Sequence, residues 1–370
     1  MYSFIASVLS LDICPEKRTA IAGTLKSHDF NWNKMVKSGS DNLVLPAFYL
    51  KLCQHSLNQF LPSDLESYLQ HVLTLNRERN SNVITLAKKV NSWLAEDGID
   101  CLFMKGAGNI LDGIYSDLGE RLLYDIDILV AADHMLPAAN ILHERGFITR
   151  KRFNPASLES TMHYPILLHE EWMTGVEIHR MPVQYHYQKE FPAERVFANK
   201  THTRQHKGFD VMGYPDRAIH NFIHAQLMHS GHYHADVKLR DLYDLLLLGK
   251  RVDLYGTFHR YHHYRSKSMA YLKLMHKVFG LQWPVELQSE KAGKHLLQRQ
   301  QRTLEMSSSR LRRHRLFITF AQKYFILPLR VLWNPYARNY VLSRLTQPRW
   351  YIEHYNAVKR MLRRGRAAKK

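Results

Sequence analysis

Residues 122–130 read LLYDIDILV, an apolar run that contains two aspartates one residue apart. An apolar run of this length predicts a buried strand. Because side chains two residues apart point to the same face of a strand, Asp125 and Asp127 share one face. Two carboxylates this close repel each other and are costly to desolvate unless a cation lies between them. The pair therefore predicts either a Mg²⁺ site or an exposed strand end at which the aspartates meet water or arginines.

Two other segments favour the metal site. LFMKGAGNIL at 102–111 predicts a strand, a glycine-containing turn and a helix, an arrangement that presents backbone N–H groups to phosphate. Only this helix separates it from the aspartate-bearing strand, so the two strands can lie side by side. GVEIHR at 175–180 predicts a further strand with Glu177 and His179 on one face. A third carboxylate on a neighbouring strand is what a two-metal site for phosphoryl chemistry requires.

The wider pattern predicts an α/β unit between two helical regions. Apolar residues recur at helical spacing in the first 95 residues, where Ser63 and Asp64 mark the start of a long helix that Gly98 ends. Further on, strands are predicted at 99–105, 122–130, 147–153, 163–170 and 175–181, and helices at 107–116 and 134–146. Beyond Pro215 the helical period returns. We therefore expect four parts: an N-terminal helical region (1–95), an α/β core (96–212), a C-terminal helical region (213–335) and a basic tail (336–370).

The net charge is concentrated near the C-terminus. Residues 291–370 hold 20 Lys and Arg against two acids, while the other 290 residues are nearly neutral, with 32 basic and 31 acidic residues. LFITFAQKYFILPLRVLWNPYARNYVL, at 316–342, also interleaves aromatic and leucine side chains with basic ones. This composition suits an anionic membrane surface, single-stranded RNA, or a basic helical bundle packed on the body of the protein.

Other features bear on where the protein works. Three widely spaced cysteines form no disulfide framework, which favours a reducing compartment. Lys323, Pro328 and Arg330 interrupt the most apolar window, so we expect no transmembrane helix. No signal peptide is predicted. We expect a cytoplasmic protein, with its basic segment able to place it at the inner face of the membrane.

The stretch FMKGAGNILDGIYSDLGERLLYDIDILV at 103–130 resembles the signature of a family of uncharacterised nucleotidyltransferases, within the DNA polymerase β-type nucleotidyltransferase superfamily. Later segments extend the resemblance over about residues 85–250. Glu177, Ile178 and His179 stand where the family usually has Asp-Leu-His. The positions that match the family pattern are Lys105, Gly106, Ala107, Tyr115, Arg121, Asp125, Asp127, Leu129, Val130, His224, His229, Leu239, Arg240 and Asp244.

The resemblance implies an α/β (α+β) fold with a small mixed sheet of nucleotidyltransferase type, flanked by N-terminal and C-terminal helical segments. It also implies an enzyme that uses Mg²⁺, or Mn²⁺, to move a nucleoside monophosphate from an NTP to a hydroxyl-bearing acceptor, such as a small molecule or glycan precursor. Asp125, Asp127 and Glu177 would hold the metals, and Glu177 could assist deprotonation of the acceptor. The residues expected to bind nucleotide are Lys105, Gly106, Ala107 and Arg121.

Several of these residues have alternative interpretations. Lys105 could replace the usual phosphate-binding Ser, or lie at a strand end with its charge in water. Arg121 could bind triphosphate or neutralise the carboxylates. His220 and His224, one helical turn apart, suggest zinc or packing beside the nucleotide cleft. The residues of second rank are His179, His224, His229, Arg240 and Asp244, of which Arg240 and Asp244 orient base or acceptor or form a helix-surface pair.

Two other functional classes fit the sequence. The basic C-terminus is compatible with a nucleotidyltransferase that modifies RNA or protein. The glutamate at position 177 and the missing phosphate-binding Ser are compatible with a non-catalytic descendant that binds nucleotide or a partner.

Overall fold

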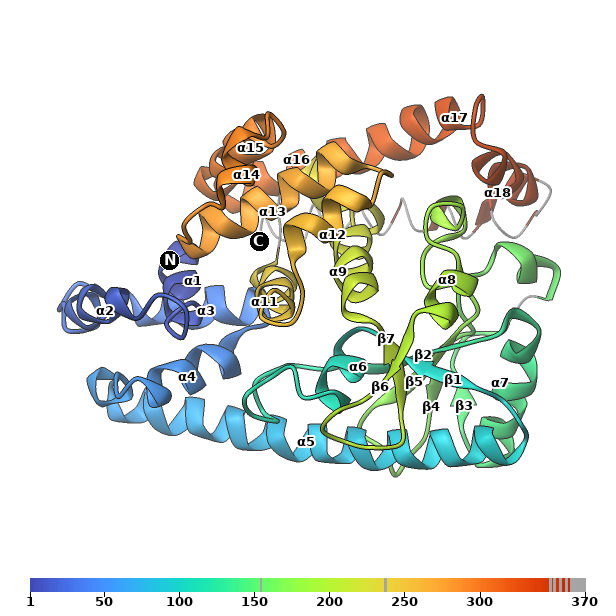
Figure 1. Cartoon of the computed structure of the whole chain (residues 1–370), viewed down its shortest axis with the longest axis horizontal. Coiled ribbons are helices and arrows are strands. Elements are labelled where there is room, and N and C mark those ends of the chain that lie inside the picture. The colour runs from blue at the N-terminus through green and yellow to red at the C-terminus, as the bar shows by residue number, and fades with distance from the viewer. Residues whose placement is uncertain are drawn as a thin grey trace.

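The computed structural model describes residues 1–153, 155–235 and 238–345, with 348, 351, 352, 355, 356 and 359 beyond them. A seven-stranded sheet lies between N-terminal and C-terminal helices (Figure 1). This confirms the predicted α/β fold with flanking helical segments. Much of the predicted basic tail (336–370) lies outside the described residues, including all of 360–370.

The N-terminal region is helical, as predicted, and its longest helix supports the sheet. Helix α5 begins directly after Pro62, carries Asp64 and Glu66 in its first turn, and ends just before Gly98, whose φ is +70°. Figure 1 shows α5 running beneath both the other N-terminal helices and the sheet. The helices are α1 (Tyr2–Leu9), α2 (Arg18–Leu25), α3 (Trp32–Asp41), α4 (Leu45–Gln54) and α5 (Ser63–Glu96).

The sheet is mixed, with strand order β3-β4-β5-β2-β1-β7-β6. Strand β2 pairs in parallel with β5, and β1 in parallel with β7, while the other pairs are antiparallel. The strands are β1 (Cys101–Phe103), β2 (Asp125–Val130), β3 (Ile148–Thr149), β4 (Leu167–Leu168), β5 (Gly175–His179), β6 (Lys200–His202) and β7 (Asp210–Met212). The predicted strands at 147–153 and 163–170 were too long, because only two residues of each enter the sheet.

The remaining helices cover the sheet and continue to the C-terminal region. Within the part of the chain that the structure describes, no helix combines the length and the apolar character needed to cross a membrane. The helices are α6 (Lys105–Leu111), α7 (Met135–Glu144), α8 (Ala193–Ala198), α9 (Tyr214–Phe222), α10 (Gly231–His234), α11 (Leu239–Leu248), α12 (Leu254–Arg260), α13 (Arg265–Phe279), α14 (Val285–Ser289), α15 (Lys294–Glu305), α16 (Ser308–Ala321), α17 (Leu327–Arg330) and α18 (Pro335–Leu345), with π-helical segments at Ile223–Met228 and Gln322–Ile326.

One apolar core joins all three regions. It includes Phe48 of α4, Ile128 of β2 and Tyr271 of α13, each fully buried. The sheet therefore packs against helices from both ends of the chain, and this packing holds the strand ends that carry the aspartates. The four-part division of the chain stays a prediction.

Candidate active site

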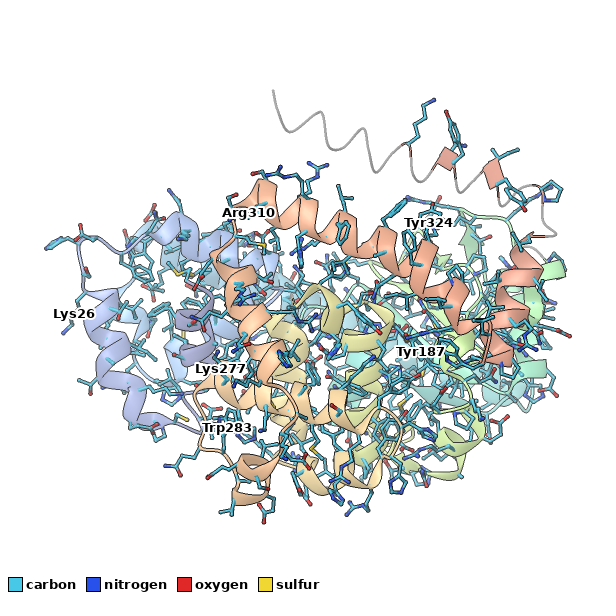
Figure 2. The ribbon with its side chains drawn as sticks, turned by 90° about the horizontal axis from the view of Figure 1, so that it is seen from above. Lys26, Tyr187, Lys277, Trp283, Arg310 and Tyr324 are labelled. Carbon is cyan, nitrogen blue, oxygen red and sulfur yellow. The ribbon has the colours of Figure 1, made fainter. Side chains whose placement is uncertain are left out.

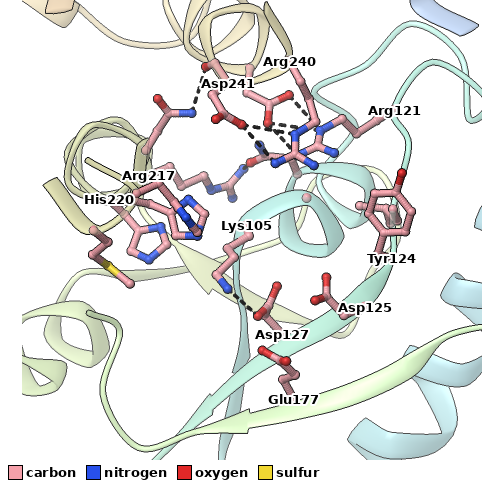
Figure 3. Close-up of a pocket in the computed structure, with 18 of the residues that line it drawn as sticks. Lys105, Arg121, Tyr124, Asp125, Asp127, Glu177, Arg217, His220, Arg240 and Asp241 are labelled. Atoms are coloured by element: carbon pink, nitrogen blue, oxygen red, sulfur yellow. Dashed lines mark hydrogen bonds and ion pairs between the residues drawn. The ribbon is translucent and has the colours of Figure 1, made fainter. Parts of the chain in front are cut away.

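Three carboxylates lie together on one face of the paired strands β2 and β5. Asp127 is opposite Glu177 in the parallel register, and Asp125 is opposite Gly175. Because side chains alternate along a strand, Asp125, Asp127 and Glu177 point to the same face. They line a pocket of about 440 Å³ between the sheet and the helices that follow it (Figure 3). The structure thus brings together the three residues that the sequence predicted as metal ligands.

Asp127 is the most deeply placed of the three, and two side chains already contact its carboxylate. Its side chain is 3% exposed, and its Oδ1 accepts from Lys105 Nζ at 2.6 Å and lies 2.8 Å from His179 Nε2. Burial alone would raise the pKa of Asp127, but Lys105 and His179 hold it well below its usual value. Asp127 is therefore ionised at any physiological pH.

Asp125 lies in a different environment. Burial, together with the neighbouring charge of Asp127, raises the pKa of Asp125 to about 6. Among the described residues, no basic side chain lies within ion-pair distance of it. Asp125 is thus a part-buried carboxylate beside other carboxylates, without an ion-pair partner in the described chain. It provides a negative charge that a bound cation would balance.

Glu177 completes the cluster on the neighbouring strand. Its Oε2 lies 3.5 Å from His179 Nε2 and 4.0 Å from His163 Nδ1. Burial opposes ionisation of Glu177, but the hydrogen bond from His179 lowers its pKa below the ordinary value. Ligand atoms of Asp127, Glu177 and His179 all lie within 4.8 Å of one another. Carboxylate oxygens so close together suit Mg²⁺ or Mn²⁺. The residues present therefore fit the metal that the family resemblance implies.

Lys105 lies at the start of α6 rather than at the end of a strand, which corrects the sequence prediction. Its φ of +50° is in the left-handed region that side-chain-bearing residues rarely adopt. The Met104 N–H donates to the Asp127 carbonyl at 2.9 Å, so the backbone leaves the sheet only after this bond. Burial would lower the pKa of Lys105, but Asp127 raises it, and the ammonium stays charged on the carboxylate. The strained turn thus directs Lys105 into the site.

Gly106 and Ala107 have different surroundings. A Cβ on Gly106 would lie 2.3 Å from Leu123 Cδ2, so any larger residue here would require the Leu123 side chain to move. Gly106 lines the pocket, whereas Ala107 is buried in the apolar core and is not among the lining residues. The predicted nucleotide contact of Ala107 therefore has no side-chain counterpart in the pocket.

Arg121 pairs with Asp244 rather than with the three carboxylates. Its Nη2 lies 2.9 Å from Asp244 Oδ2, and Tyr115 donates to Asp244 Oδ1 at 2.8 Å. Asp244 is buried, so the predicted helix-surface pair with Arg240 is wrong; Arg240 instead lies 3.2 Å from Asp241. Both Arg121 and Asp244 line the pocket wall, where they join the segment before β2 to α11.

Histidines from α9 and the following π-helical segment line the wall opposite the carboxylates. His220 Nε2 lies 2.8 Å from the Pro182 carbonyl, and His224 Nε2 lies 3.1 Å from His229 Nε2. Burial lowers the pKa of His220 to about 4 and that of His224 well below its usual value, so both are neutral at pH 7. In the described chain, Asp127, Glu177 and His179 form the only group with three metal-ligand atoms this close, so His224 and His229 lack a third zinc ligand.

The pocket also contains residues that the sequence did not single out. Tyr124, 56% exposed, lies at the rim directly before Asp125, and His163 packs against His179 with tilted rings and ring centroids 5.0 Å apart. Arg217, on α9, lies in the pocket wall with its Nη1 2.8 Å from Asp112 Oδ2. Tyr124 precedes β2, so the alternation of side chains along the strand does not predict its position. His163 and Arg217 are brought to the site by packing between segments distant in sequence.

The mixed sheet, with a turn into a helix and three carboxylates on paired parallel strands, is consistent with a nucleotidyltransferase-type α/β fold. A family model described as an uncharacterised nucleotidyltransferase matches residues 28–275, and the chain belongs to this family. The match confirms the resemblance seen in the sequence and extends it into the N-terminal helices. Neither the curated proteins nor the solved structures contain a match to the chain.

Proposed function

We propose that this protein uses a divalent cation to transfer a nucleoside monophosphate from an NTP to a hydroxyl group. The observation that carries the proposal is the parallel register of Asp127 with Glu177, with Asp125 two residues away on the same face. Asp125, Asp127 and Glu177 would hold Mg²⁺ or Mn²⁺. When bound, the metal would neutralise the phosphates and lower the pKa of the attacking hydroxyl.

The residues around the cluster support an assignment of roles. In the transfer, a bond forms between the acceptor oxygen and the α-phosphorus, the bond from that phosphorus to the bridging oxygen breaks, and pyrophosphate leaves. Glu177, ionised and 20% exposed, would accept the hydroxyl proton. Lys105 would meet the phosphates beside Gly106, since its ammonium lies within reach of the same space. The neutral His224 and His229 would contact base or acceptor.

The acceptor is proposed from the size of the pocket. A volume of about 440 Å³ lies in the range of small-ligand sites. This favours a small molecule, or the end group of a larger precursor such as a glycan.

Pyrophosphate release from each of the four NTPs tests the proposal. With Mg²⁺ and a cell extract as the source of acceptor, we expect release by the wild type and at least a ~10³-fold loss in Asp125→Asn and Glu177→Gln. Asp133→Asn, which alters an exposed acid beyond the end of β2, is the matched control and keeps its activity. Turnover by either site variant at the wild-type rate would sink the proposal.

The non-catalytic alternative is distinguished in the same experiment. The contact of Lys105 with Asp127 at 2.6 Å is compatible with a site that binds nucleotide without turnover. NTP binding measured by calorimetry, with no pyrophosphate release under any condition, would favour that class.

A further inference from the structure

The helices at the C-terminal end of the described chain expose an unusual amount of apolar surface. Helix α16, the π-helical segment Gln322–Ile326 and α17 follow one another without a break. They cross the face of the molecule that Figure 2 shows from above, with Arg310 and Tyr324 marking their course. We name the exposed apolar residues here the α16–α17 surface: Phe317, Phe320, Tyr324, Phe325, Leu329, Leu332 and Trp333.

The exposed side chains are large and close together. Phe317 is 69% exposed, Leu332 70% and Trp333 68%. The ring centroid of Phe320 lies 4.5 Å from that of Tyr324 and 6.2 Å from that of Phe325, so these three rings form a contiguous group. Single exposed apolar side chains are common on proteins, but a group of this size marks an interaction site.

The segment that forms this surface carries charge of one sign. Residues 306–352 contain no Asp or Glu and nine Lys or Arg. Arg310 and Arg313 are exposed on the first turns of α16, and Lys323 lies among the aromatics. Arg330 differs from these, because its guanidinium lies 5.7 Å from the Tyr187 ring and holds the helix against the body of the protein. The exposed basic groups of this segment therefore border the apolar residues.

We propose that the α16–α17 surface binds the headgroup region of an anionic lipid bilayer, with its apolar side chains entering the acyl boundary. Basic residues beside exposed Phe, Trp and Leu are the composition of helices that lie in the plane of a membrane interface. The proposed contact is peripheral, since helices of this composition lie in the plane of the interface.

Charge and composition favour lipid over other occupants. A second copy of the chain would bring two strongly basic surfaces together, which repel each other. Single-stranded RNA would use the aromatic rings and arginines, but it would leave Leu329 and Leu332 without a function, because stacking needs a planar side chain. An anionic bilayer satisfies the basic, aromatic and aliphatic residues at once.

Flotation of the full chain with vesicles tests the proposal. We expect binding to vesicles that contain phosphatidylglycerol at least ~10-fold tighter than to vesicles of phosphatidylcholine alone. The variant Leu332→Ser/Trp333→Ser should bind anionic vesicles at least ~10-fold more weakly, since both side chains would leave the acyl boundary. Arg310→Gln/Arg313→Gln should reduce the preference for anionic lipid. The matched control is Tyr68→Ser/Leu75→Ser, which alters two exposed apolar residues of α5 and keeps wild-type binding.

Contrary outcomes either overturn the proposal outright or assign the surface to another occupant. Equal binding to both vesicle types, or full binding by Leu332→Ser/Trp333→Ser with an unchanged melting curve, overturns the proposal. Self-association that this variant abolishes, without vesicle binding, would show a second copy. Binding of single-stranded RNA that the wild-type chain prefers over anionic vesicles would assign the surface to RNA.

Discussion

At the residue scale, Asp125 and Asp127 share a face but not an environment. Asp127 accepts from Lys105 and lies 2.8 Å from His179, whereas burial and the charge of Asp127 raise the pKa of Asp125 to about 6. Protons therefore compete with a metal for Asp125. On lowering the pH from about 7.5 to about 5, we expect the Mn²⁺ dissociation constant to rise about tenfold, as followed by electron paramagnetic resonance.

The control for this pH dependence is Asp133→Asn, which should behave as the wild type. In Asp125→Asn, Mn²⁺ should bind more weakly at neutral pH and with a flatter pH profile. A wild-type dissociation constant that does not change over this range would contradict the role given to Asp125.

The same two aspartates should affect stability in opposite directions. The folded pKa of Asp125 lies above its ordinary value of 3.8, so ionised Asp125 destabilises the fold at pH 7, and this cost disappears as the pH falls from about 6 to about 4. In metal-free protein we expect Asp125→Asn to raise the free energy of unfolding by about 1–2 kcal/mol. Asp127→Asn should lower it by about 1–3 kcal/mol, because buried charge-assisted bonds to Lys105 and His179 are lost.

Urea denaturation with a chelator present measures both changes. Addition of Mg²⁺ should stabilise the wild type and leave Asp125→Asn nearly unchanged. If the free energy of unfolding changed in the same direction in Asp125→Asn and Asp127→Asn, the environments given to the two aspartates would be wrong.

At the scale of elements, the buried pair of Arg121 and Asp244 ties the start of β2 to α11. Three of its hydrogen bonds join the guanidinium to the carboxylate at 2.9–3.1 Å. Asp244→Asn should lower the free energy of unfolding by about 3–5 kcal/mol, because it leaves Arg121 as an uncompensated buried charge. Arg121→Met/Asp244→Leu should recover much of this loss in urea denaturation. A double variant less stable than Asp244→Asn would show that the pair itself, rather than its charge balance, stabilises the contact.

Elements with a strong local signal were predictable from the sequence. Helix α5 has long periodicity and end signals, and the face shared by Asp125 and Asp127 followed from their spacing alone. That Glu177 shares this face depends on the pairing of β2 with β5. Strands β3 and β4 were predicted too long, because a strand ends where its partner ends, and the partner is distant in sequence. Strands β6 and β7 are only three residues each and give almost no signal.

The remainder of the site depends on long-range contacts. Arg121 and Asp244 are 123 residues apart in sequence, and nothing local indicates that they pair. The left-handed φ of Lys105 places its ammonium on Asp127, although the sequence favoured a strand at this position. The π-helical turn that brings His224 to His229 also has no local sequence signature.

At the scale of the whole molecule, Glu120 joins three regions of the chain. Buried Lys51 of α4 lies 3.7 Å from its carboxylate, and Tyr243 of α11 donates a hydrogen bond to it. Glu120 lies just before β2, so the N-terminal helices, the sheet and the C-terminal helices meet at one buried charge. The packing of the aspartate-bearing strand therefore depends on both ends of the chain.

This interdependence predicts that the α/β core does not fold alone. A fragment of residues 96–212 would expose the apolar faces that α5, α9 and α11 cover, and would lose Lys51 and Tyr243 as partners of Glu120. We expect the fragment to lack cooperative unfolding by circular dichroism, whereas residues 1–305 should unfold in urea in one transition seen alike by circular dichroism and tryptophan fluorescence. Two separate transitions, or a folded 96–212 fragment that binds Mn²⁺, would instead show that the metal site is built by the sheet alone and that the helices are independent units around it.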